Sequence, residues 1–135
     1  MFVVKAAQDK DLQRYICSVL KTEYKENALS FYAADLKDNL VDIESYISIC
    51  QFYLSGDGEI IDLTAAEGRE KDEAVIVMLR AVMSFMHRCG VKNALFANGS
   101  TNEWWLKKSG FLCCDGRYSM DLEKFYTSPC KHSEE

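Results

Sequence analysis

The sequence predicts an α/β fold of the α+β type, with a mixed, mostly antiparallel sheet, one central parallel strand pair and helices on both faces. Three segments predict the parallel pair: an apolar strand at Glu59–Ala65, a long apolar helix at Glu73–Cys89 and a second strand at Val91–Ala97. A strand, helix and strand of these lengths are joined by a parallel crossover. Turn residues at Ser55–Gly58 and Asp115-Gly116 predict antiparallel hairpins on either side of this unit.

Length and composition indicate one folded domain. The chain has 135 residues, of which 48% are hydrophobic and 12% aromatic. This composition excludes a disordered or low-complexity protein, and the length is sufficient to bury a core without disulfides. We expect a single domain over residues 1–126. Residues 127–135 are mostly polar and hold the only proline, so we expect a flexible C-terminal tail there.

Charge and hydropathy narrow the class of partner. The formal net charge is −5, and neither sign forms a long block. Nucleic acid and anionic membrane surfaces are therefore not expected as partners, because both require a basic face. The apolar stretch Ala74–Leu79 is too short to span a membrane, and Lys5 comes too early for a signal peptide. A cytoplasmic protein is expected.

The six cysteines predict neither a metal site nor a disulfide framework. They form no C-x-x-C pair and no spacing typical of zinc ligands. Cys17 and Cys89 fall on apolar helix faces, and Cys50 lies in an apolar strand segment. Cysteines in such places are usually small buried hydrophobic residues in a reducing compartment.

The first half of the chain begins with a strand and a helix. Phe2–Ala6 is predicted as a short strand, and Asp9 or Asp11 caps a helix whose apolar residues recur at the helical period as far as Leu20. The segment Ser45–Leu54 is rich in Ile, Tyr and Phe and predicts another strand.

Residues 25–39, between these elements, fit two structures. Leu29, Tyr32, Ala33 and Leu36 match the spacing of a second helix, whereas the shorter run Leu29–Ala33 also fits a strand. We favour the helix.

The second half of the chain has clearer boundaries. In the strand 59–65, alternation predicts that one face carries Ile61, Leu63 and Ala65. The long helix is apolar nearly all round, which predicts burial on more than one side, and Gly90 ends it. Ser100–Glu103 matches a capping box that starts a short helix ending at Gly110.

The order of these elements resembles the GNAT superfamily of acyl-CoA N-acyltransferases over essentially the whole chain, and best over Leu63–Phe111. In that family an L-x-V strand precedes a loop of pattern R/Q-x-x-G-x-G/A, a long helix, a glycine, a strand and a short helix ending in Y-x-x-x-G-F. Leu63 and Ala65 match the strand, Gly90 matches the glycine, and Gly110-Phe111 match the final pair.

The resemblance implies an acetyltransferase. The family's parallel strands splay apart and hold the pantetheine arm of acetyl-CoA, while backbone N–H groups of the loop and first helical turn face the pyrophosphate. An acetyl group is then transferred to an amine. For this chain the implied cofactor is acetyl-CoA, the implied acceptor is a small-molecule or peptide amine, and a homodimer is compatible with the resemblance.

Two positions depart from the family pattern. The first loop glycine falls on Glu73 or, in the alternative register, on Asp72, and the tyrosine position falls on Leu106. A carboxylate about 5 Å from a phosphate charge costs roughly 3 kcal/mol at an effective dielectric of about 20. The alternative function is therefore a catalytically degenerate GNAT-fold binding or regulatory module that does not bind CoA in the usual way. A third alternative is a homodimeric structural subunit.

The resemblance also assigns candidate site residues. Those implied to bind the cofactor come from the strand, the loop with its helix start, and the end of the second strand: Leu63, Thr64, Ala65, Arg69, Glu70, Lys71, Glu73, Ala74, Val75, Asn98 and Asn102. No residue is assigned to a metal.

Three residues are candidates for acid–base chemistry. Glu59 and Asp62 lie where a general base would stand, although solvated edge charges are the plainer interpretation. Tyr118 could replace the missing tyrosine as the acid that protonates the thiolate, although cross-strand packing also explains it. Trp104 and Trp105 fit either a ligand cleft or the core.

Overall fold

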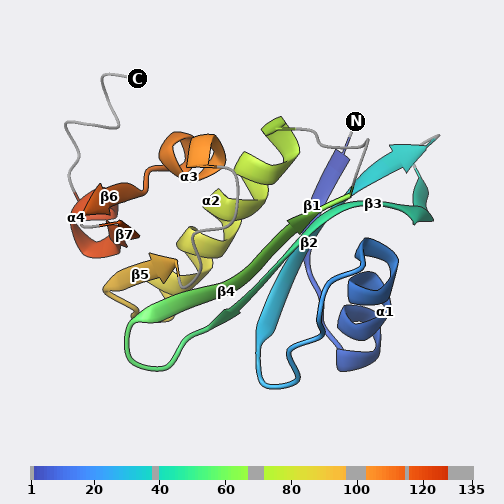
Figure 1. Cartoon of the computed structure of the whole chain (residues 1–135), viewed down its shortest axis with the longest axis horizontal. Helices are drawn as coiled ribbons and strands as arrows, with labels where there is room; N and C mark the ends of the chain where they lie inside the picture. The colour runs from blue at the N-terminus through green and yellow to red at the C-terminus, as the bar shows by residue number, and fades with distance from the viewer. Residues whose placement is uncertain (1, 38–39, 67–71, 97–102, 115, 128–135) are drawn as a thin grey trace.

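The computed structural model describes residues 2–37, 40–66, 72–96, 103–114 and 116–127. Its elements follow in the order β1 (Phe2–Ala6), α1 (Lys10–Leu20), β2 (Leu29–Lys37), β3 (Leu40–Tyr53), β4 (Gly58–Ala65), α2 (Asp72–Arg88), β5 (Asn93–Phe96), α3 (Glu103–Ser109), β6 (Leu112–Cys114), β7 (Arg117–Asp121) and α4 (Leu122–Thr127). The strands form one sheet in the order β1-β2-β3-β4-β5-β7-β6 (Figure 1).

The sheet is antiparallel except at its centre. Within the described residues, β4 and β5 form the one parallel pair, with Gly58 opposite Ala94 and Ile60 opposite Phe96. The helix α2 joins the two strands as the crossover. The predicted fold class, a mostly antiparallel sheet with a central parallel pair, is therefore confirmed.

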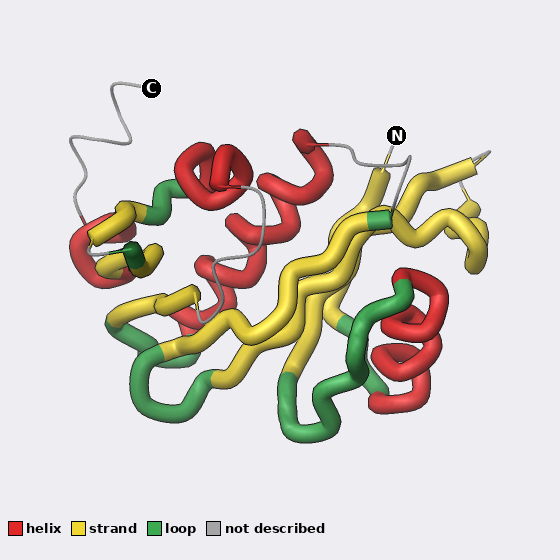
Figure 2. The backbone as a smooth tube through the Cα atoms, viewed as in Figure 1, coloured by secondary structure: helices red, strands yellow, loops and turns green. Residues whose placement is uncertain are grey.

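The sheet separates two hydrophobic cores, and helices cover both faces (Figure 2). On one face α1 packs against β3 and contributes Ile16 to a smaller core that includes Ile49. On the other face α2 crosses β1, β2 and β3, and contributes Met78 to a larger core that includes Cys50. Ile49 and Cys50 are neighbours in β3, so alternation along one strand supplies both cores.

The helix favoured for residues 25–39 is wrong, because Leu29–Lys37 forms strand β2. This strand pairs with β1 on one side and β3 on the other. Tyr32 and Ala34 enter the α1 core while Ala33 enters the α2 core. A strand buried on both faces shows no polar alternation, so its sequence cannot be distinguished from a short buried helix by periodicity.

The start of α1 follows the prediction. Asp9 is the N-cap, and its side chain accepts a hydrogen bond from the backbone N–H of Leu12 at 2.7 Å. The helix ends at Leu20, and its C-cap residue, Lys21, has a left-handed backbone with φ of 61°.

The prediction of which β4 residues share one face of the sheet is wrong in part, because the strand contains a β-bulge. Gln51 of β3 lies opposite Asp62, whereas the next residue, Phe52, lies opposite Ile60. Ile61 is the extra residue, and as a result Ile60 and Leu63 both join the α2 core. A bulge shifts the alternation by one residue, so strict alternation could not place Ile61 correctly.

The end of the chain contains a helix that the pattern did not predict. Helix α4 reaches Thr127 and packs on α2, with the His87 and Tyr126 rings stacked at 4.6 Å between centroids. Residues 128–135 lie outside the described part. None of the described helices is both long and apolar enough to cross a membrane.

Candidate active site

The candidate site lies where the parallel pair ends. The pairing of β4 with β5 runs from Gly58 to Ile60, whereas β4 continues to Ala65. Over that last stretch the described residues pair β4 only with β3. Ligands of sheets with parallel strands bind at the carboxyl ends of those strands, where the connections leave in different directions. Here β4 leads towards α2 and β5 towards α3.

The three strand residues assigned to cofactor binding occupy this end of β4. Leu63 is buried in the α2 core and Ala65 packs against it, while Thr64 is partly exposed on the α1 face. Backbone groups of a strand alternate between its two edges. Some of the backbone N–H and C=O groups of residues 61–65 therefore point to the side of β5, where the described residues form no further strand pairing.

The cofactor-binding candidates at the start of α2 differ in whether their side chains are exposed or buried. Glu73 is exposed, but the side chains of Ala74 and Val75 are fully buried in the core. Only their backbone N–H groups, in the first helical turn, remain to contact a ligand. Arg69, Glu70, Lys71, Asn98 and Asn102 lie outside the described residues.

The first residue of α2 makes a contact that the sequence did not predict. Asp72 accepts a hydrogen bond from the indole Nε1 of Trp105 in α3, at 2.6 Å from Oδ1. The Trp105 side chain is 7% exposed. One of the two tryptophans is thus a core residue, while Trp104 is 46% exposed.

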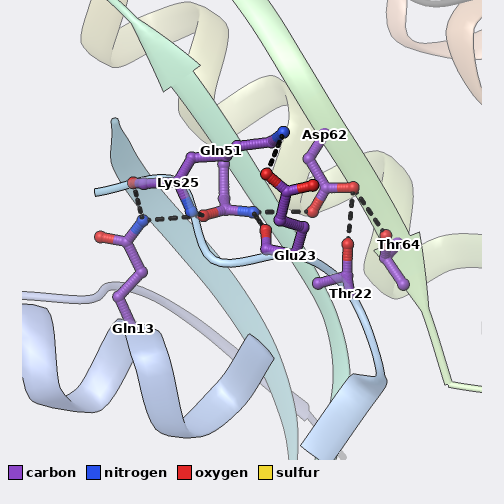
Figure 3. A network of polar contacts seen from close by, with 7 residues as sticks. All are labelled: Gln13, Thr22, Glu23, Lys25, Gln51, Asp62 and Thr64. Carbon is purple, nitrogen blue, oxygen red and sulfur yellow. Dashed lines mark hydrogen bonds and ion pairs between the residues drawn. The ribbon is translucent and has the colours of Figure 1, made fainter. Parts of the chain in front are cut away.

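Asp62 is held by three donors on the α1 face of the sheet (Figure 3). Its Oδ1 accepts from the hydroxyls of Thr22 at 3.0 Å and Thr64 at 2.8 Å. Its Oδ2 accepts from Nε2 of Gln51 at 2.9 Å. A carboxylate has about four acceptor positions, so these donors leave about one of them for another group.

The network continues from Asp62 through Gln51, which is fully buried. Oε1 of Gln51 accepts from Nε2 of Gln13 and from the backbone N–H of Lys25, each at 2.9 Å, and its Nε2 also donates to the carbonyl of Glu23. These bonds fasten the segment between α1 and β2 to the sheet. Both glutamines interrupt otherwise apolar faces of their elements, a signal that could have located the network.

Asp62 also influences the nearby thiols. Burial, together with the negative charge of Asp62, raises the pKa of Cys17 to about 11. Burial and the same charge raise the pKa of the Cys50 thiol still further. Only a thiolate is an effective nucleophile, so neither cysteine is suited to covalent catalysis at neutral pH.

Glu59 shares a sheet face with Asp62 because of the bulge. It is partly exposed and lies opposite Tyr53 of β3 and Leu95 of β5. A strand rises about 3.3 Å per residue, so four residues separate Glu59 from Leu63 by roughly 13 Å. Of the two candidate bases, Asp62 is therefore the one at the carboxyl end of β4.

Tyr118 is buried, at 5% exposure, and lies opposite Phe96 at the end of β5. Burial raises the pKa of its hydroxyl, and a hydrogen bond with Glu103, the Glu103 charge and the neighbouring Cys113 raise it further. The phenol therefore stays protonated at neutral pH. Leu106, at the family's tyrosine position, is 1% exposed and has no proton to donate.

The described residues contain no group of three or more His, Cys, Asp or Glu side chains placed to hold a metal ion.

Comparisons with known proteins identify the fold. No family model and no curated sequence matches this chain. A Desulfovibrio desulfuricans protein assigned to the GNAT family of acetyltransferases has a TM-score of 0.60 and 10% identity, covering 90% of this chain and 99% of that one. A variant of the Vibrio cholerae spermidine N-acetyltransferase SpeG has a TM-score of 0.63 and 10% identity, covering 95% and 98%.

A third solved structure contains a bound cofactor. N-acetylglutamate synthase from Neisseria gonorrhoeae, in complex with coenzyme A and N-acetyl-glutamate, has a TM-score of 0.59 and 15% identity, covering 85% of this chain and 29% of that one. At these identities the likeness is one of fold. The chain has the fold of the GNAT N-acyltransferases, as its sequence predicts.

Proposed function

We propose that this protein is an N-acetyltransferase that transfers an acetyl group from acetyl-CoA to an amine. The observation that carries the proposal is the parallel β4–β5 pair: β4 continues past Ile60 to Ala65, and along that stretch the described residues pair it only with β3. This leaves a strand edge for the amide-containing arm of the donor, within a fold shared with acetyltransferases.

The reaction would use backbone and side-chain groups at the end of β4. The amine nitrogen attacks the thioester carbonyl carbon, so that a C–N bond forms and the C–S bond breaks. Backbone N–H groups of Leu63–Ala65 would stabilise the negative charge that develops on the carbonyl oxygen. Asp62, with its remaining acceptor position, would take the proton from the amine, and the departing thiolate would take a proton from water, because Tyr118 lies in the core on the other face of the sheet, level with Ile60.

A panel of amines with acetyl-CoA tests this proposal through the release of free thiol. The panel contains spermidine, an aminoglycoside and glutamate, which represent the acceptors named for solved proteins of this fold. Thiol release that depends on one of the amines is the expected result. No release with any amine, together with no thermal shift in millimolar acetyl-CoA, contradicts the proposal.

The role of Asp62 is tested by Asp62→Asn, which removes the base. We expect kcat to fall by about 100-fold, as for the loss of a general base. Thr22→Val is the control, because it removes one hydrogen bond of the same network and leaves the carboxylate in place. Equal losses of kcat in both variants would show that the network, and not the base, matters.

The second candidate is the catalytically degenerate module. The buried Leu106 and the two acids at the start of α2 favour it. Such a module would not bind CoA in the usual way and would transfer no acetyl group to any amine of the panel.

A further inference from the structure

The hydrogen bond between Asp72 and Trp105 joins the two segments that follow the parallel strands. Asp72 begins α2, which follows β4, and Trp105 belongs to α3, which follows β5. Figure 1 shows α3 beside the upper turns of α2. The contact therefore lies at the end of the pair where a ligand would enter.

This bond holds a negative charge at the start of α2. At 2.6 Å it is short, as charge-assisted hydrogen bonds are, and its donor is an almost fully buried indole. Packing of α2 against α3 holds that donor in place. Asp72 is itself exposed, but this bond limits how freely its carboxylate can turn away from an approaching anion.

The resemblance implies that the diphosphate of the donor faces this start of α2, where Asp72 places a negative charge. The N–H groups of the first helical turn and the positive end of the helix dipole favour one anion, and here the chain supplies it. The sequence from 67 to 73 adds no compensating excess of cations, since it holds four acids and two bases. A diphosphate at this position would meet repulsion in place of attraction.

The edge of β4, unlike the start of α2, offers backbone amide groups and apolar side chains to a ligand. Backbone N–H and C=O groups of Ile61–Ala65 that point away from β3, and that no other strand of the described residues pairs, suit the amides of a pantetheine arm, as they would suit a further strand. Leu63 and Ala65 add apolar surface. Binding of the donor at this edge does not depend on a negative charge of the donor.

We propose that Asp72, held by Trp105, is a specificity-determining residue that makes the enzyme select its thioester donor by the acyl-pantetheine arm and not by the diphosphate. The preferred donor class is an acyl-pantetheine thioester with little negative charge near the start of α2. This inference rests on the acetyl transfer proposed above. It differs from that proposal in naming the part of the donor that is recognised.

Calorimetric titration with acetyl-CoA and with acetyl-pantetheine, which lacks the nucleotide and its phosphates, tests the inference on the unmodified chain. We expect the two dissociation constants to agree within about threefold, which is about 0.7 kcal/mol. Acetyl-CoA binding at least 100-fold tighter than acetyl-pantetheine would overturn the inference and leave the acetyltransferase proposal standing. Binding of neither thioester would contradict both.

The substitution Asp72→Asn tests whether Asp72 is the residue that prevents recognition of the diphosphate. The asparagine keeps an oxygen that can accept from the Trp105 indole and removes only the charge. Acetyl-CoA affinity should rise about tenfold, as expected for one partly screened charge, while acetyl-pantetheine affinity should stay unchanged. The control is Asp57→Asn, the same chemical change in the exposed turn before β4. An equal gain in both variants, or no gain in Asp72→Asn, would overturn the assignment to Asp72.

Discussion

Gln51 shows how a single buried residue can connect separate parts of this chain. Its side chain makes four hydrogen bonds, which reach α1, the segment after it and β4. Every donor and acceptor of the amide is therefore used. Because the side chain is fully buried, water cannot replace a lost partner.

Gln51→Met, a substitution of similar volume, should lower the free energy of unfolding by about 3 kcal/mol, because it leaves several buried polar groups without partners. Urea denaturation measures this as a lower midpoint with an unchanged m-value. Gln8→Met is the control, since Gln8 is exposed. Equal effects of the two substitutions would contradict the role given to the network.

Cys17 gives a pH dependence whose sign follows from its raised pKa. The folded state holds the thiol protonated up to about pH 11, whereas the unfolded chain releases the proton at lower pH. The stabilisation is therefore complete below the ordinary thiol pKa and is lost as the pH rises through the folded value. Denaturation of the unmodified chain should show stability falling from about pH 9 to pH 11.

Cys17→Ala should make this fall shallower. Cys50 retains its own raised pKa in the variant, so part of the pH dependence should remain. An identical slope in the two proteins over this pH range would contradict the assignment to Cys17.

At the scale of elements, the capping of α1 offers a clean comparison between neighbouring acids. Asp9 accepts a hydrogen bond from the Leu12 N–H, whereas Asp11 makes an exposed ion pair with Arg14. Asp9→Ala should cost about 1 kcal/mol of unfolding free energy, and Asp11→Ala at most about 0.5 kcal/mol. Thermal or urea denaturation measures both, and a larger loss from Asp11→Ala would contradict the capping geometry.

The elements differ in how far their own residues determine them. The α1 cap, the α2 stop at Gly90 and the hairpin turns depend on local chemistry, so the sequence predicts them. Strand β2 depends on neighbours far along the chain, since Val4 and Ser48 lie opposite its central residue Ala33. The bulge at Ile61 likewise depends on the register with β3, which no local pattern reveals.

At the scale of the whole molecule, the order of elements was sufficient to predict the centre of the sheet. A strand, helix and strand of these lengths predict a parallel crossover, and β4 and β5, joined through α2, are parallel. The side-chain contacts of the site could not be predicted from the sequence in the same way. Asp62 was predicted as a candidate, but its three donors come from α1's trailing segment, β3 and β4. Only the assembled fold brings those together.

The central claim is that the carboxyl end of β4 holds the donor thioester, and an NMR titration of the ¹⁵N-labelled protein with acetyl-CoA tests it most directly. We expect the largest amide shifts on Leu63–Ala65. Shifts confined to the α1 face around Ile16, or no shifts at millimolar acetyl-CoA, would contradict it.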